Sequence, residues 1–300
     1  MVKQTILLMK FEGIICPMIS PFTLDGKVYV EGLKNLIEFL IKHGCNGLFV
    51  CGTYGLGPAM STDERKKIAE LTVEYASGKL DIIINVGSSN IDASIELAKH
   101  AEDTGADAVA STAPFYYKYE DEGIYSFFTK LLNEVNIPLF VYNIPSRVGY
   151  GISPQLLGKL ADEGVEGIKD TSGDIIAFYQ YMMAVNQKEF KFLVGTERLL
   201  LPSIIAGGHG CVAGLANIFP EYIVELYRLI KEKKYQEAVK KQFFIIDLRE
   251  VIYSVPNIPG TYAVLKLRGI DVGYPKPPHR PLSENQLNKL ITMLKERKLI

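Results

Sequence analysis

The feature that most constrains this chain is a repeat: a short apolar, β-rich run, then a turn, then an amphipathic stretch of helix length. Successive runs begin roughly 18 to 35 residues apart, which is typical of strand–helix units. We predict strands at residues 13–18, 47–51, 81–86, 106–111, 138–142, 167–170, 191–194 and 210–213.

The intervening stretches carry the signals that begin and end helices. Ser61 stands three residues before Glu64, the spacing of a capping box. Ser153 precedes Pro154, a cap residue followed by a proline at the first helical position. Residues 30–43 place apolar side chains on one face and meet Gly44, which favours a helix end there.

Eight strand–helix units in one chain of 300 residues favour an α/β fold of the (β/α)8 TIM-barrel type. Closure of the barrel leaves no sheet edge exposed. An open, doubly wound parallel sheet is the alternative.

The segment after Pro220 carries helical patterns without clear strands, at residues 222–233, 235–251, 260–267 and 283–298. We interpret the first as closing the barrel and the others as an addition to it. The expected organisation is therefore a barrel over residues 1–233 and a C-terminal helical extension over residues 234–300.

Charge and hydropathy narrow the class of partner. The 33 basic and 34 acidic residues nearly cancel and form no block, so we expect no nucleic-acid partner. The apolar segment 199–219 is interrupted by Pro202, Gly207, Gly208 and Gly210, so we expect no membrane span. The N-terminal apolar run covers only residues 6–9, too short for a signal peptide, and the cytoplasm is the expected compartment.

Cysteines and histidines give little support for a metal or disulfide. Cys16, Cys51 and Cys211 fall in apolar runs, and none of the four cysteines forms a C-x-x-C pair, so we expect small buried apolar side chains. The four histidines lie far apart, without ligand spacing, so we expect no metal. His209 sits among glycines in what we interpret as a turn, with a phosphate-binding loop as a minor alternative.

Lys169 is the polar residue that most suggests chemistry. It closes the run Gly-Val-Glu-Gly-Ile-Lys at the end of a predicted strand, where the active groups of TIM barrels gather. Burial there would disfavour its charged form and expose an amine that attacks a carbonyl. A lysine in a buried salt bridge, or one reaching the rim, is the alternative.

Two more polar residues follow the preceding strand. Tyr142 ends it and could relay a proton, although a buried ring with a hydrogen-bonded hydroxyl is common in cores. Arg147 follows in the loop, where its guanidinium suits a substrate carboxylate. A surface loop arginine is the alternative.

Two loops complete the candidates. Gly52-Thr53-Tyr54-Gly55 ends the second strand and offers backbone amides to a small anion, but it matches neither the P-loop nor the dinucleotide fingerprint. Residues 114–119 hold three tyrosines that could line a site or a subunit contact.

Together these motifs resemble the dihydrodipicolinate synthase/N-acetylneuraminate lyase family of class I aldolases over nearly the whole chain. The specific matches are Gly52-Thr53-x-Gly55, Tyr142-Asn143-x-Pro145 and Gly167-Ile-Lys-Asp-Thr171. The resemblance implies that Lys169 forms a Schiff base with pyruvate or a related 2-oxo acid, without a cofactor.

The resemblance also implies roles for neighbouring residues. Tyr142 would relay protons, and Thr53 would bind the substrate carboxylate and link Tyr142 to Tyr116, which can come from a neighbouring subunit of a homotetramer. Gly195 and Val212 would shape the pocket. Tyr54, Arg147 and Thr171 are further candidate contacts to substrate.

Subtype signals are mixed. Tyr54 stands where many members have a second threonine. The stretch from Gly52 to Pro58, the late Gly-Tyr-Pro-Lys-Pro-Pro run and Thr171 look most like archaeal 2-keto-3-deoxygluconate aldolases. Arg147 is similar to the arginine of dihydrodipicolinate synthase that binds aspartate semialdehyde. We expect cleavage of 2-keto-3-deoxy sugar acids to pyruvate and an aldehyde. Dihydrodipicolinate synthase, N-acetylneuraminate lyase and a non-enzymatic 2-oxo acid binding protein are the alternatives.

Overall fold

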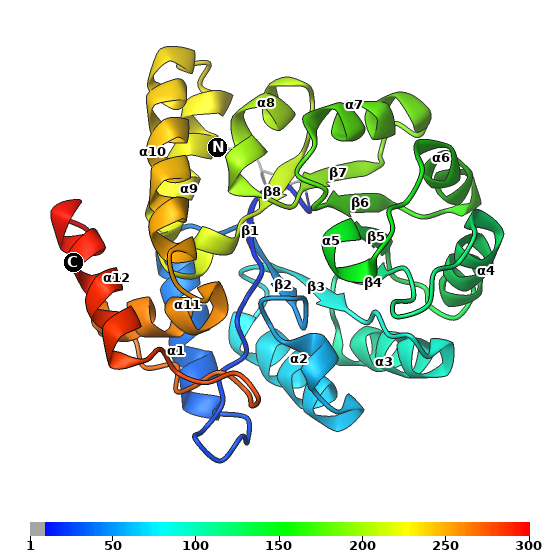
Figure 1. Ribbon diagram of the computed structural model, residues 1–300. Helices are drawn as coiled ribbons and strands as arrows, with labels where there is room; N and C mark the ends of the chain where they lie inside the picture. Colours follow the sequence, from blue (N-terminus) through cyan, green and yellow to red (C-terminus); the bar gives the residue numbers. More distant parts are fainter. Residues whose placement is uncertain (1–9) are drawn as a thin grey trace, which may run out of the picture.

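The computed structural model of the protein describes residues 10–300, so the apolar run at residues 6–9 lies outside the described residues. Eight parallel strands form a closed barrel in chain order (Figure 1). They are β1 (Gly13–Cys16), β2 (Gly47–Val50), β3 (Asp81–Asn85), β4 (Ala108–Thr112), β5 (Leu139–Asn143), β6 (Gly167–Asp170), β7 (Lys191–Val194) and β8 (Gly210–Val212).

Helices follow the strands and surround the barrel (Figure 1). They are α1 (Val30–Lys42), α2 (Thr62–Ala76), α3 (Ile91–Thr104), α4 (Asp121–Leu132), α5 (Pro145–Val148), α6 (Pro154–Glu163), α7 (Ile175–Ala184), α8 (Leu200–Ile205), α9 (Pro220–Lys231), α10 (Tyr235–Tyr253), α11 (Asn257–Leu267) and α12 (Glu284–Glu296).

The predicted TIM barrel is confirmed, and the open sheet is excluded because β1 pairs with β8, with Gly13 opposite Gly210. Each predicted strand is present, and its ends differ from the prediction by at most two residues. The largest differences are at β1, which ends two residues early, just before Pro17, and at β4, which begins two residues late. Proline has no N–H to donate to a strand ladder, which accounts for the first difference.

The predicted helix signals operate as expected. The Ser61 hydroxyl accepts from the Glu64 amide at 3.2 Å, and the Ser61 amide donates to the Glu64 carboxylate at 2.8 Å. Ser153 likewise caps α6 by accepting from the Leu156 amide at 3.1 Å. Each bond satisfies a first-turn group that has no partner within its helix.

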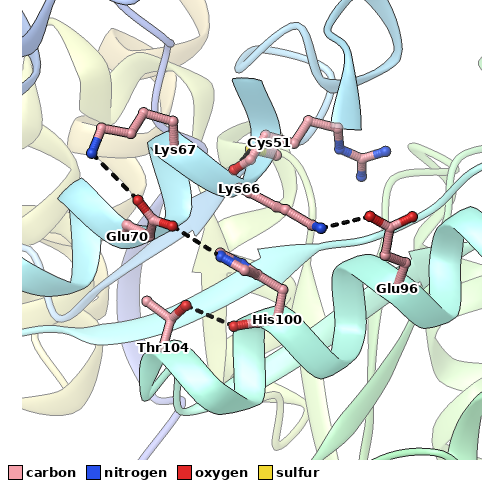
Figure 2. A network of polar contacts seen from close by, with 8 residues as sticks. Cys51, Lys66, Lys67, Glu70, Glu96, His100 and Thr104 are labelled. Atoms are coloured by element: carbon pink, nitrogen blue, oxygen red, sulfur yellow. Dashed lines mark hydrogen bonds and ion pairs between the residues drawn. The ribbon is translucent and has the colours of Figure 1, made fainter. Parts of the chain in front are cut away.

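Neighbouring outer helices are joined by polar contacts, of which α2 and α3 give the clearest example (Figure 2). Glu70 lies between Lys67, at 3.4 Å, and His100, at 3.1 Å. Lys66 and Glu96 form a second link at 2.5 Å. Because these pairs are solvated, each contributes little, roughly 0–1 kcal/mol. The apolar faces beneath supply most of the stability.

The C-terminal helices α10, α11 and α12 lie together on one side of the barrel, beside α1 and α9 (Figure 1). The Gln242 side chain of α10 donates to the Glu197 carbonyl at 2.9 Å and accepts from the Leu201 amide at 3.0 Å. The Tyr262 hydroxyl of α11 donates to the Ser20 carbonyl at 2.6 Å. The barrel loops and these helices are thus held together by buried hydrogen bonds.

The structure bears on two further expectations, the burial of the cysteines and the absence of a membrane span. Cys16, Cys45, Cys51 and Cys211 are all buried free thiols, as predicted. Within the described residues, no helix combines the length and apolar character that crossing a bilayer requires.

Candidate active site

Lys169 lies at the C-terminal end of β6, opposite Tyr142 of β5 in the strand register. Its side chain is buried, with the residue only 3% exposed. Its Nζ atom is 3.6 Å from the centre of the Phe49 ring and 3.8 Å from the centre of the Tyr142 ring. Among residues 10–300 it forms neither a hydrogen bond nor an ion pair, so the buried salt-bridge alternative is excluded for the described chain.

The environment of Lys169 favours the uncharged amine. Burial lowers the pKa of Lys169 well below its usual range. The two aromatic faces attract a cation by about 1–2 kcal/mol. Removing an unpaired ammonium from water costs more, on the order of several kcal/mol. Desolvation therefore prevails, and the amine lone pair is available to attack a carbonyl.

Tyr142 presents its ring to this amine, and its hydroxyl lines the same cleft. The Thr53 hydroxyl lies 3.2 Å from the Tyr142 hydroxyl, and the Phe49 ring meets the Tyr142 ring edge to face at 5.2 Å. Burial raises the pKa of Tyr142, an effect that the hydrogen bond to Thr53 opposes. The phenol is therefore protonated near neutral pH and can donate a proton and take it back.

A cleft of about 320 Å³ opens above Lys169 at the C-terminal ends of the strands. It brings together all but one of the predicted site residues, namely Lys169, Tyr142, Thr53, Tyr54, Arg147, Thr171, Gly195 and Val212. The missing member is Tyr116, which is 87% exposed, packs against Tyr117, and does not line the cleft within one chain.

Gly195 and Thr171 form a close contact on the floor of the cleft. A Cβ atom at Gly195 would lie 1.9 Å from the Thr171 Oγ1 and 2.9 Å from the Asp170 carbonyl oxygen. No residue larger than glycine fits there without movement. The Thr171 Oγ1 is itself buried without a hydrogen-bond partner in the described part of the chain. It lies close to the Tyr142 phenol, whose pKa it helps to lower against the effect of burial.

Several residues of the cleft were not predicted. Glu197 follows β7 and is buried, and Arg249, Tyr253 and Asn257 come from α10 and α11. The strand-end rule that identified Lys169 could have identified Glu197. No local signal marks the other three, because they reach the barrel from the C-terminal helices.

The structure also shows where the potential metal ligands and the glycine-rich loop around His209 lie. In the part of the chain that the structure describes, no three potential metal ligands come together. His209 precedes β8, and its Nδ1 accepts from the Phe192 amide at 3.1 Å. The loop of residues 207–210 therefore lies at the N-terminal end of the barrel, away from Lys169, which argues against a phosphate site there.

The chain is similar to known proteins over almost its whole length. A protein-family model described as the dihydrodipicolinate synthetase family matches residues 10–297. A 4-hydroxy-tetrahydrodipicolinate synthase from Methanopyrus kandleri is 32% identical over 290 residues, which cover 96% of each chain. The 4-hydroxy-tetrahydrodipicolinate synthase from Bacillus subtilis is 31% identical, and the match covers 96% of this chain and 100% of that protein.

Solved structures agree with these sequences. YagE, an Escherichia coli K12 prophage protein of the dihydrodipicolinic acid synthase family in complex with pyruvate, has a TM-score of 0.93 at 28% identity. The two chains are covered to 97% and 100%. A variant of 2-keto-3-deoxygluconate aldolase from Sulfolobus solfataricus has a TM-score of 0.88 at 31% identity, with 95% of this chain and 96% of that chain covered.

These likenesses include the barrel, the cleft and the C-terminal helices. The named relatives are synthases and aldolases, so the protein is an enzyme of the lyase class. On its sequence and its architecture alike, the chain belongs to the dihydrodipicolinate synthetase family.

Proposed function

We propose that the protein is a pyruvate-dependent class I aldolase that reversibly cleaves 2-keto-3-deoxy sugar acids, of the 2-keto-3-deoxygluconate type, to pyruvate and an aldehyde. The observation that carries the proposal is the buried amine of Lys169, which has no ion pair among residues 10–300 and lies against the Tyr142 ring. The cytoplasm is the compartment we expect for such an enzyme.

The reaction begins when the Lys169 amine attacks the C2 ketone to form a carbinolamine. Tyr142 protonates the departing hydroxyl, water leaves, and an iminium forms. The deprotonated Tyr142 then takes the proton of the C4 hydroxyl, the C3–C4 bond breaks, and its electron pair moves into the iminium to give an enamine and a free aldehyde. Protonation of the enamine carbon and addition of water release pyruvate and restore the amine. The protein supplies position, a dry environment and a proton relay.

The carboxylate of the 2-oxo acid fits the polar side of the cleft. The hydroxyls of Thr53 and Thr171 and the backbone at Gly195 line it together. Val212 would form the apolar wall.

The sugar-acid subtype is supported by uncharged polar groups elsewhere in the cleft. Ser172, Thr196, Tyr253 and Asn257 present hydroxyl and amide groups that suit a hydroxylated aldehyde. The likeness to the Sulfolobus solfataricus aldolase agrees with this choice.

A second candidate is 4-hydroxy-tetrahydrodipicolinate synthase, which condenses pyruvate with aspartate semialdehyde. It is favoured by Arg147, an exposed guanidinium at the cleft that forms no ion pair among the described residues. The curated relatives named above carry that activity in their names. Severe loss of this condensation in Arg147→Ala would support it, and absence of product from the wild type would exclude it.

We also propose a homotetramer built as a dimer of dimers. A second, mostly apolar cavity of about 320 Å³ lies next to Thr53 and Tyr142 and includes Phe115 in its lining. Tyr116, the next residue, is exposed and has a φ of 83°. We expect Tyr116 of the partner subunit to reach this region and extend the Thr53–Tyr142 relay. Sedimentation velocity, with Tyr116→Phe assayed for turnover, tests both parts.

The experiment for the function is release of pyruvate from 2-keto-3-deoxygluconate, with Lys169→Ala as the control. Release by the wild type and not by the variant supports the proposal. Full activity in Lys169→Ala refutes the Schiff-base mechanism. A borohydride-trapped pyruvate adduct without sugar-acid cleavage favours the synthase. Calorimetric 2-oxo acid binding with no trapped adduct indicates a binding protein.

A further inference from the structure

Tyr54 joins the barrel to the junction of two C-terminal helices. Its hydroxyl lies 3.1 Å from the hydroxyl of Tyr253, the last residue of α10. The side-chain amide of Asn257, the first residue of α11, donates to it at 3.3 Å. All three residues line the cleft that contains Lys169. The barrel loop and the helix junction therefore form one continuous wall.

The hydroxyl end of the Tyr54 ring also lies against Gly214, two residues after the end of β8. A Cβ atom at Gly214 would lie 2.8 Å from the Tyr54 hydroxyl oxygen and 2.9 Å from its Cζ. Tyr54 thus lies between the end of β8 and the helix junction and touches both.

This wall is also held from behind. The Gly214 amide donates to one oxygen of Glu197 at 3.0 Å, and the other oxygen lies 3.1 Å from the Nε of Arg249. The Arg249 guanidinium carbon lies 3.6 Å from the centre of the Tyr253 ring. The contacts close a circuit from Gly214 through these residues back to Tyr54. Displacing the phenol would require several of them to break.

The two ends of the cleft therefore differ. The end near Arg147 is exposed to solvent. The end near Gly214 is closed by Tyr54 and the helix junction. The cleft volume, about 320 Å³, lies at the small end of the range for ligand sites.

We propose that Tyr54 sets the upper limit on the length of the aldehyde partner, by occupying the closed end of the cleft into which the aldehyde's carbon chain extends. The inference rests on the proposed aldolase function and adds the acceptor class, a short aldehyde of the glyceraldehyde type. Hydrogen bonds from Tyr253 and Asn257 hold Tyr54 in place, and the bulk of its ring excludes longer chains.

The test measures condensation of saturating pyruvate with glyceraldehyde, erythrose and arabinose, for wild type, Tyr54→Thr and Tyr54→Phe. For each enzyme, kcat/KM for a longer aldehyde is divided by kcat/KM for glyceraldehyde, and this ratio is compared between variant and wild type. The open-chain fraction of each sugar is the same for all enzymes and cancels in the comparison. Tyr54→Thr should raise the ratio by about tenfold or more, the scale of a steric clash in a binding pocket. Tyr54→Phe should keep the wild-type ratio because the ring still fills the space.

A second variant covers the case in which Tyr54→Thr fails to fold. Tyr253 is 40% exposed, so Tyr253→Ala should fold normally while it removes the support of the Tyr54 ring and raises the ratio. Borohydride trapping of pyruvate reports the intact Lys169 site in each variant.

The outcomes separate the two proposals. Wild-type ratios in Tyr253→Ala, and in Tyr54→Thr if it folds, with adduct formation and glyceraldehyde turnover retained, overturn the role of Tyr54 and leave the aldolase function standing. An equal rise in Tyr54→Phe and Tyr54→Thr overturns the steric explanation. A wild-type enzyme that accepts none of the three aldehydes refutes the proposed function, and this inference with it.

Discussion

Replacing the buried lysine with methionine tests the electrostatic basis of the site. Burial lowers the pKa of Lys169 well below its usual value of 10.5. In the unfolded chain the amine is solvated and keeps its proton up to that usual value. Between the two pKa values the unfolded state therefore binds one proton more than the folded state. The free energy of unfolding then rises with pH across that window, and the stability lost to burial returns only as pH approaches 10.5.

The size of this effect follows from the difference of one bound proton between the two states. The free energy of unfolding changes by about 1.4 kcal/mol per pH unit for each such proton. From pH 8 to pH 9.5, wild type should gain up to about 2 kcal/mol that Lys169→Met does not gain. The variant should therefore be more stable than wild type at pH 8, with a difference that shrinks toward pH 9.5.

The assay is urea unfolding followed by far-UV circular dichroism at each pH. Lys188→Met, which removes an exposed lysine with no ion pair among the described residues, is the matched control and should follow the wild-type curve. Parallel pH curves for Lys169→Met and wild type would mean that Lys169 binds the same proton in both states. That result would refute the account of Lys169 as a neutral amine.

Three further substitutions probe the rest of the site. Tyr142→Phe keeps the ring but removes the proton relay, so the rate of borohydride-trapped adduct formation should fall by about 10²- to 10⁴-fold; an unchanged rate would remove Tyr142 from the mechanism. Gly195→Ala forces a methyl group against Thr171, so the free energy of unfolding in urea should fall by about 1–3 kcal/mol and the affinity for pyruvate in calorimetry should also fall. Wild-type values for both would contradict the contact. Thr171→Val should weaken pyruvate binding in calorimetry, because it removes a hydroxyl next to the Tyr142 phenol in the cleft; unaltered affinity would exclude it from the carboxylate site.

The local part of this architecture could be predicted from the sequence. Strands β6 and β7 have the predicted bounds, and Ser61 and Ser153 cap the predicted helices. These features depend on the spacing of apolar residues and on hydrogen bonds between near neighbours. Lys169 could be identified for a related reason, since parallel strands in a barrel place their C-terminal ends on one face.

Other features needed the tertiary structure. Tyr54 meets Tyr253 across 199 residues of sequence, and no periodic pattern records a contact between a barrel loop and a helix added after the barrel. The same holds for Arg249 and Glu197, whose pairing depends on where α10 packs. Tyr116 does not line the cleft within one chain, so its sequence position next to Phe115 gave no measure of its distance from Lys169.

Lys169 shows where the division lies. The sequence by itself determined that a lysine stands at the end of a barrel strand. Only the tertiary structure decided that it is buried against Phe49 and Tyr142 without an ion pair among residues 10–300. The charge state of an amine depends on the groups and solvent around it, and these come from parts of the chain that meet only when the barrel closes.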